Sequence, residues 1–205
     1  MIAIIDYKAG NLTSVKLAFE HLGVKAEITD LPEKISRAER AVFPGVGSAG
    51  AAMENIKRMK LDRVIAEVVG SGKPFLGICL GTQIIFDSSE EDGGTAGLGL
   101  ISGTVRRFTP EKKSDKVPQI GWNTVDFCRP HPVLEGIESG SEFYFVHSYY
   151  ALPAMKDEIV GETGYAGATF ASIVGKNNLI ATQFHPEKSG GIGLRLLQNF
   201  SRWNP

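Results

Sequence analysis

The sequence has little cysteine, almost no net charge and no long apolar run. Two cysteines among 205 residues are too few for a disulfide scaffold, so we expect free thiols. A net charge of −1, with no basic run longer than two residues, argues against a nucleic-acid or membrane-surface role. No apolar segment approaches the ~20 residues of a membrane span, and the opening MIAIIDYK lacks the basic start of a secretory signal. These absences predict a soluble, cytoplasmic protein.

The composition that remains is that of a folded chain. Hydrophobic residues make up 42% and charged residues 22%, so we expect a sizeable core and no extensive disorder. A chain of this length is routine for one compact unit. We therefore expect residues 1–205 to form a single domain.

The first half of the chain alternates between strand and helix patterns. Residues 1–6 form a continuous apolar run that ends in an acid, which is typical of a strand buried on both faces. Asn11 is suited to cap the helix that follows. The expected strands are 1–6, 24–28, 40–43 and 74–78, and the expected helices are 12–22 and 51–69. This alternation predicts an α/β fold with an open, mostly parallel central sheet flanked by helices.

The second half of the chain is richer in short β-like runs. Gly, Pro and Asn separate these runs, which predicts antiparallel additions to the sheet. The runs cover residues 100–108, 120–127, 142–152, 158–163, 169–174 and 179–184. We also expect a last helix over 193–203 and exposed loops at 92–94 and 111–115.

The segment KPFLGICLGTQIIF places Cys79 in a G-x-C-x-G pattern between a buried strand and a helix. This is the arrangement of a nucleophile elbow, with sulfur in place of the hydroxyl. A residue on so sharp a turn has a strained backbone, and only glycine at positions 77 and 81 lacks the Cβ that would clash. The N–H groups at the start of the helix would favour the reactive thiolate. The alternative is a buried core cysteine, and Cys128, which has no glycine frame, is expected to be structural.

A nucleophilic cysteine needs a base and a group that orients the base. His185 ends the run LIATQFHPEK, which brings it to the carboxyl edge of the sheet, and Glu187 follows two residues later. Cys79, His185 and Glu187 would then form a catalytic triad. His147, in YFVHSYY, is the rival base, and only the carboxylate adjacent to His185 separates the two histidines at this level.

An oxyanion formed during attack by the cysteine needs two backbone N–H donors. One candidate is the amide of Leu80, the residue after the nucleophile. The other should come from the PGVG loop at 44–47, where Val46 and Gly47 are the candidates, because glycines let a backbone approach a substrate closely. The alternative for this loop is a plain turn.

Six segments together resemble a known family. PGVGSAG, GICLGTQ and QFHPEKS resemble the class I glutamine amidotransferases, the triad glutaminases. DYKAGNLTSV, PQIGWN and FYFVHSYYA resemble, more narrowly, the glutaminase subunits of imidazole glycerol phosphate synthase. The resemblance covers nearly the whole chain in the right order and implies a flavodoxin-like fold.

The resemblance implies a role for several residues. Cys79 would attack the side-chain amide of glutamine, releasing ammonia and forming a γ-glutamyl thioester, while His185 moves protons and Glu187 orients the imidazole. The glutamine-binding residues that it implies are Gly45, Gln83, Ser148 and Tyr149. We expect neither a cofactor nor a metal site.

The resemblance also implies a partner. It is a (β/α)₈-barrel cyclase that forms a heterodimer with the glutaminase and uses the ammonia to convert the nucleotide PRFAR to imidazole glycerol phosphate and AICAR in histidine biosynthesis. The residues that fall in partner-facing segments are Asn11, Trp122, Tyr144 and Lys188. One departure from the family pattern is Thr82, where methionine is commoner, and we expect it to perturb only the packing behind Gln83.

Three alternatives remain open. The first is the amidotransferase subunit of another pathway, serving pyridoxal phosphate, anthranilate or purine synthesis, although those subunits lack the combination of GNLTSV with QIGWN. The second is a stand-alone cysteine peptidase or esterase. The third is a non-catalytic regulator on the same fold, which is disfavoured because Cys79, His185 and Glu187 are all present.

Overall fold

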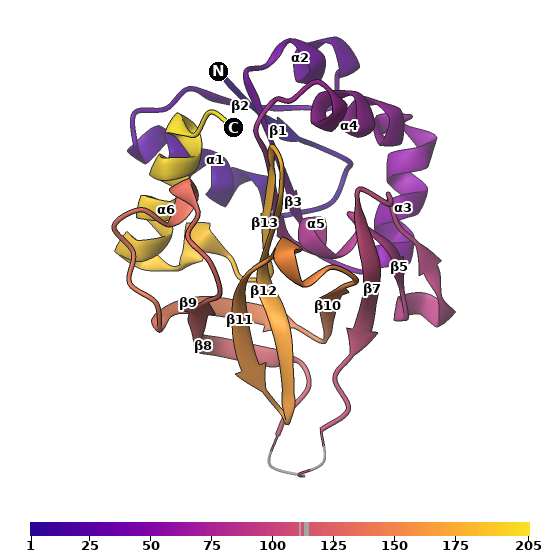
Figure 1. Ribbon diagram of the computed structural model, residues 1–205. Coiled ribbons are helices and arrows are strands. Elements are labelled where there is room, and N and C mark those ends of the chain that lie inside the picture. Colours follow the sequence, from indigo (N-terminus) through magenta and orange to yellow (C-terminus); the bar gives the residue numbers. More distant parts are fainter. Residues whose placement is uncertain (111, 113–114) are drawn as a thin grey trace.

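The chain forms a central β-sheet with helices on both of its faces in the computed structural model, which describes residues 1–110, 112 and 115–205 (Figure 1). The strands are β1 (Ile2–Ile5), β2 (Ala26–Thr29), β3 (Arg40–Gly45), β4 (Phe75–Cys79), β5 (Phe86–Ser89), β6 (Thr95–Ala96), β7 (Ile101–Arg107), β8 (Gln119–Phe127), β9 (Ser141–His147), β10 (Tyr149–Pro153), β11 (Ile159–Tyr165), β12 (Ala168–Lys176) and β13 (Leu179–Thr182). The α-helices are α1 (Leu12–His21), α2 (Pro32–Arg37), α3 (Ala49–Arg58), α4 (Leu61–Gly70), α5 (Leu80–Gln83) and α6 (Gly190–Arg202), and the 3₁₀ turns are η1 (Glu91–Gly93), η2 (Pro132–Leu134), η3 (Lys156–Glu158) and η4 (Pro186–Lys188).

The parallel part of the sheet has the strand order β2-β1-β3-β4-β13. Each of these neighbours pairs in parallel with the next. With β13 taken as the fifth strand, this is the 2-1-3-4-5 order of flavodoxin-like sheets, in which ligands bind beyond the carboxyl ends of the strands. The predicted α/β class and parallel centre are therefore confirmed.

Two apolar clusters cover the two faces of this sheet. In β1, Ala3 and Ile5 point into the cluster under α2, α3 and α4, whereas Ile2 and Ile4 point into the cluster under α1 and α6. Figure 1 shows these two groups of helices on opposite sides of the strands. The uninterrupted apolar run at the start of the sequence is thus explained by burial on both faces.

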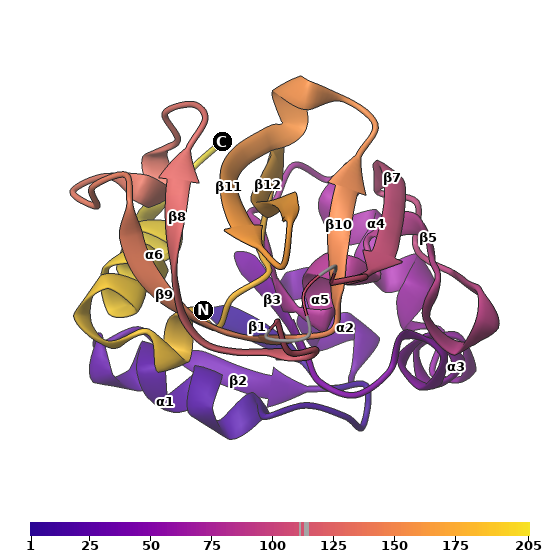
Figure 2. The same cartoon turned by 90° about the horizontal axis from the view of Figure 1, so that it is seen from below.

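The second half adds antiparallel strands, as predicted, but two of its pairings are parallel: β13 with β4 and β7 with β5. β12 pairs with β13, β10 with β12 and β7, and β11 with β12 and β8, all antiparallel. In Figure 2, β8 and β9 lie beside α6 at one end of this layer, and β10, β7 and β5 lie at the other.

Two predicted elements are each broken in the structure. The single helix expected at 51–69 is wrong, because α3 ends before Lys60, whose φ of 57° starts a new helix, α4. Ile56 and Leu61 are both fully buried, so the break lets both helices pack on one face of the sheet. The single strand expected at 142–152 is also wrong, because it divides at Ser148 into β9 and β10, which pair with different strands.

Smaller differences concern the ends of elements. Asn11 precedes α1 as expected, but its side chain makes no capping hydrogen bond there. The last helix begins three residues earlier than expected, at Gly190, and the short helix α2 has no counterpart in the sequence prediction. The loop expected at 92–94 is exposed, whereas residues 111, 113 and 114 of the loop expected at 111–115 lie outside the described residues. Over the described part of the chain, every helix is too short or too polar to cross a bilayer.

Candidate active site

Cys79 occupies a strained turn at the end of β4. Its φ of 55° and ψ of −110° lie in a region that residues with a side chain rarely adopt. A Cβ on Gly81 would lie 1.9 Å from the carbonyl oxygen of Phe43, and one on Gly77 would lie 2.9 Å from the Cβ of Ala181. The explanation given for the glycine frame is therefore confirmed. The helix that follows, α5, is a single turn of four residues.

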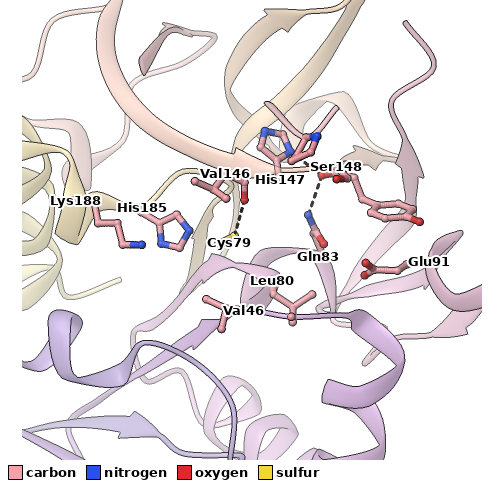
Figure 3. Close-up of a pocket in the computed structure, with 13 residues that line it drawn as sticks. Val46, Cys79, Leu80, Gln83, Glu91, Val146, His147, Ser148, His185 and Lys188 are labelled. Carbon is pink, nitrogen blue, oxygen red and sulfur yellow. Dashed lines mark hydrogen bonds between the residues drawn. The ribbon is translucent and has the colours of Figure 1, made fainter. Parts of the chain in front are cut away.

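His185 reaches the cysteine because β13 lies beside β4 in the sheet. Its Nδ1 lies 2.8 Å from Oε1 of Glu187, and the two side chains are only 5% and 2% exposed. Burial opposes protonation of the imidazole, but the interactions with Cys79 and Glu187 outweigh it and raise the pKa of His185 to about 10. Figure 3 shows the imidazole directed at Cys79, so the structure brings the three predicted triad residues together.

His147, the rival base, is occupied elsewhere. Its Nδ1 lies 2.7 Å from the carbonyl oxygen of Tyr149, and its Nε2 lies 3.0 Å from the side-chain amide of Gln119. Burial lowers the pKa of His147 to about 4, so the ring is neutral and carries one N–H. Both ring nitrogens face oxygen atoms, Nδ1 the carbonyl of Tyr149 and Nε2 the Oε1 of Gln119, which leaves no ring nitrogen for Cys79. The geometry therefore favours His185 as the base.

A cavity of about 310 Å³ lies over the sulfur, which is a suitable size for one amino acid. It is lined by Val46, Gly47, Cys79, Leu80, Gln83, Glu91, Pro118, Val146, His147, Ser148, Tyr149, His185 and Lys188 (Figure 3). All the predicted oxyanion and glutamine-binding residues are in this set except Gly45, which is buried beneath the loop and pairs with Cys79 in the sheet. The roles of these residues in binding and catalysis stay predictions.

The loop after β3 rests on a buried tyrosine. A Cβ on Gly45 would lie 2.6 Å from the Tyr7 hydroxyl, which makes no hydrogen bond of ordinary geometry with any described residue. Burial raises the pKa of Tyr7, and the backbone N–H of Val46, which faces the phenol oxygen, acts in the opposite direction. Gly47 has a φ of +94°, so the loop uses a conformation that favours glycine.

Glu91 is a cavity residue that the sequence analysis missed. Its Oε2 accepts a hydrogen bond of 2.8 Å from the backbone N–H of Ala49, and Asp92 accepts one of 2.9 Å from Gly50. These two carboxylates thereby hold the first turn of α3, directly after the PGVG loop. Burial raises the pKa of Glu91. The acidic run in the sequence gave no signal of this role, because nothing placed it next to α3.

Neither Cys128 nor Thr82 is placed to take part in catalysis. Cys128 is exposed and lies in another part of the molecule, where partial burial and the neighbouring Glu162 and Asp126 raise the pKa of its thiol. Thr82 is fully buried and donates a hydrogen bond of 2.6 Å to the carbonyl oxygen of Thr182. Its effect on the packing behind Gln83 stays a prediction.

The predicted partner-facing residues lie on the surface. Trp122 is 54% exposed and meets Tyr144 across β8 and β9, with ring centroids 6.0 Å apart. Ile120, on the same face of β8, is 64% exposed, and Asn11 and Lys188 are exposed as well. Large exposed apolar side chains of this kind are a mark of interaction surfaces.

Comparisons with known proteins agree with this geometry. Residues 3–202 match the sequence model of the family described as glutamine amidotransferase class-I. The chain is 49% identical to imidazole glycerol phosphate synthase subunit HisH of Methanocaldococcus jannaschii over 200 residues, which are 98% of each chain. It is 50% identical to the protein of the same name from Nitratidesulfovibrio vulgaris, covering 99% of this chain and 96% of that one.

Solved structures share the fold at much lower identity. The structure of PurLQS from Thermotoga maritima superposes with a TM-score of 0.78 at 20% identity, covering 98% of this chain and 97% of that one. A structure described as a glutamine amidotransferase superposes with a TM-score of 0.75 at 16% identity.

Proposed function

This chain belongs to the class I glutamine amidotransferases, and we propose that it is the glutaminase subunit of an imidazole glycerol phosphate synthase. It hydrolyses glutamine to glutamate and ammonia and delivers the ammonia to histidine biosynthesis. The observation that carries the proposal is that Cys79 and His185 line one small cavity while Glu187 contacts the imidazole of His185. The near full-length identity to HisH proteins of about one half supports the pathway.

The chemistry follows from the placement of these groups. The Cys79 sulfur attacks the side-chain carbonyl carbon of glutamine, and the negative charge develops on the carbonyl oxygen, where the amide of Leu80 can donate. The C–N bond then breaks, and the protonated His185 gives its proton to the departing amine, which leaves as ammonia. Water, deprotonated by His185, hydrolyses the γ-glutamyl thioester and regenerates the cysteine. Glu187, bonded to Nδ1, keeps Nε2 directed at the sulfur.

The cavity offers separate groups for the two ends of glutamine. Ser148 and Tyr149, at the break between β9 and β10, lie on its wall and would hold the α-amino acid end. The carboxylate of Glu91 also lines the cavity and, when ionised, has a charge opposite to that of the α-ammonium group. Gln83, one turn after Cys79, would contact the substrate through its side-chain oxygen.

A partner subunit is expected to cover the mouth of this cavity. We assign this role to a (β/α)₈-barrel cyclase, bound as a heterodimer, which receives ammonia and converts PRFAR to imidazole glycerol phosphate and AICAR. The docking surface would contain Asn11, Trp122, Tyr144 and Lys188, and Lys188 also lines the cavity next to His185. The exposed Trp122 and Ile120 support this assignment. The cytoplasmic location expected from the sequence stays a prediction.

The conformation of the PGVG loop is consistent with control of glutamine hydrolysis by the partner subunit. The backbone N–H of Val46 acts on the pKa of the buried Tyr7 phenol, which supports an orientation toward Tyr7 and away from an oxyanion above Cys79. Rotation of one peptide would redirect it, and the positive φ of Gly47 shows that the loop adopts unusual backbone angles. We infer that cyclase binding triggers this rotation and completes the oxyanion hole.

We expect the isolated chain to hydrolyse glutamine slowly and the complex with the cyclase to be about 10²-fold faster, because one missing oxyanion donor costs about that much. Ammonia release from glutamine would be measured for the chain alone, with the purified cyclase, and with cyclase plus PRFAR. An unrelated protein replaces the cyclase as the control. Equal rates with and without the cyclase would rule out control through the loop.

A further inference from the structure

Gln183 is a buried polar residue that the reaction as described does not use. It lies between β13 and His185, is fully buried, and is not among the described residues that line the cavity. Its side-chain oxygen accepts a hydrogen bond of 3.1 Å from Nε2 of Gln83. Its own Nε2 lies 4.0 Å from the sulfur of Cys79 and donates toward it.

The direction of these hydrogen bonds is fixed by a backbone carbonyl. Nε2 of Gln83 donates to the carbonyl oxygen of Tyr149 at 2.8 Å, and a carbonyl can only accept. The amide nitrogen of Gln83 is therefore the donor, and the side-chain oxygen of Gln183 is the acceptor. The nitrogen of Gln183 is then left facing the sulfur, so the orientation of both amides follows from the network.

The sulfur has different partners in its two protonation states. As a thiol, Cys79 donates to the carbonyl oxygen of Val146 at 3.7 Å. As a thiolate it cannot donate, and its favourable neighbours are the protonated imidazole of His185 and the N–H of Gln183. Hydrogen bonds to charged groups are stronger than those to neutral ones. A carbonyl beside the sulfur would repel the thiolate, whereas an amide N–H stabilises it.

We propose that Gln183 stabilises the thiolate of Cys79 and ties it to Gln83 through a directed chain of hydrogen bonds. That a thiolate is needed for catalysis rests on the proposed function. The fraction of Cys79 present as thiolate can be measured without any glutaminase activity. This chain of hydrogen bonds ends at Gln83, which lines the cavity. The orientation of the Gln83 side chain and the ionisation of Cys79 are therefore coupled.

The test is the pH dependence of Cys79 alkylation by iodoacetamide in the full chain, measured by peptide-resolved mass spectrometry. Loss of the donor in Gln183→Met should raise the midpoint of the profile by about one pH unit. Gln183→Glu keeps the acceptor for Gln83 but removes the donor, and should shift the midpoint in the same direction. The Gln183→Glu variant also provides the test if Gln183→Met fails to fold.

Two references separate this effect from general damage to the site. Thr182→Val removes the neighbouring buried hydrogen bond to the carbonyl oxygen of Phe184 and should leave the midpoint unchanged. Cys128, which is exposed, reports reagent reactivity within each sample. Unchanged midpoints in both Gln183 variants overturn the inference, whereas a wild-type complex that releases no ammonia from glutamine overturns the proposed function instead.

Discussion

Replacement of Cys79 by alanine is expected to abolish glutamine-dependent synthesis by the complex, with a loss of at least about 10⁴-fold, because no other group can form the thioester. Synthesis from added ammonium salts should continue at the wild-type rate, since that step is assigned to the proposed cyclase partner. Both activities would be measured on the same preparation, with PRFAR as substrate. The outcome separates a nucleophile from a structural cysteine.

The matched control for this variant is Cys128→Ala. Cys128 is exposed and lies outside the cavity, so both the glutamine-dependent and the ammonia-dependent rate should be retained. Loss of both activities in Cys79→Ala would mean that the cysteine supports the fold or the docking of the partner. In that event the role assigned to it here is wrong.

Replacement of Gly81 by alanine is expected to destabilise the fold by roughly 3–5 kcal/mol. The added Cβ would lie 1.9 Å from the carbonyl oxygen of Phe43, and because that neighbour is backbone in β3, a side-chain rotation cannot relieve the overlap. The strand or the turn must move, which also displaces Cys79. Urea unfolding of the variant and the wild type measures the loss of stability.

Gly70→Ala provides the comparison for this substitution. Gly70 is the last residue of α4, and a Cβ there would meet nothing within 4 Å. Alanine is the better helix former and lowers the entropy of the unfolded chain, so this variant should be slightly more stable, by up to about 1 kcal/mol. Similar stabilities for the Gly81 and Gly70 variants would contradict the steric explanation of the turn.

The parallel sheet was predictable because its signal is local. Continuous apolar runs mark the strands β1, β3 and β4. The run at 179–184 marks β13, although it was expected as an antiparallel addition and pairs in parallel with β4. The carboxyl ends of β3, β4 and β13 then meet at one edge by the geometry of a parallel sheet, which brings the PGVG loop, Cys79 and His185 together. This is why residues far apart in the sequence were assigned to one site.

The two broken elements were not predictable, because their breaks carry no local signal. Lys60 adopts a positive φ without glycine or proline beside it, as tertiary packing of Ile56 and Leu61 overrides helix propensity. Ser148 interrupts a run that is strand-like throughout. That second break has a functional consequence, because it places Ser148 and Tyr149 on the wall of the cavity.

The site residues that were missed act through tertiary contacts. In the sequence, Glu91 and Asp92 have the pattern of an acidic surface loop. Only the structure shows that their carboxylates accept hydrogen bonds from the first residues of α3. Gln183 reads as part of a strand until its amide is seen between Gln83 and the sulfur. Residue type and spacing indicated the nucleophile and its base, but the groups that support them lie in segments with no pattern of their own.

The most direct test is covalent labelling of the complex, in the presence of PRFAR, with a diazo ketone analogue of glutamine. If the Cys79 sulfur is the nucleophile for glutamine, mass spectrometry will find one adduct, on Cys79. Excess glutamine will protect against labelling, and glutaminase activity will fall in proportion to the adduct. A Cys79 that stays unmodified, or a label found on Cys128 instead, would contradict the account.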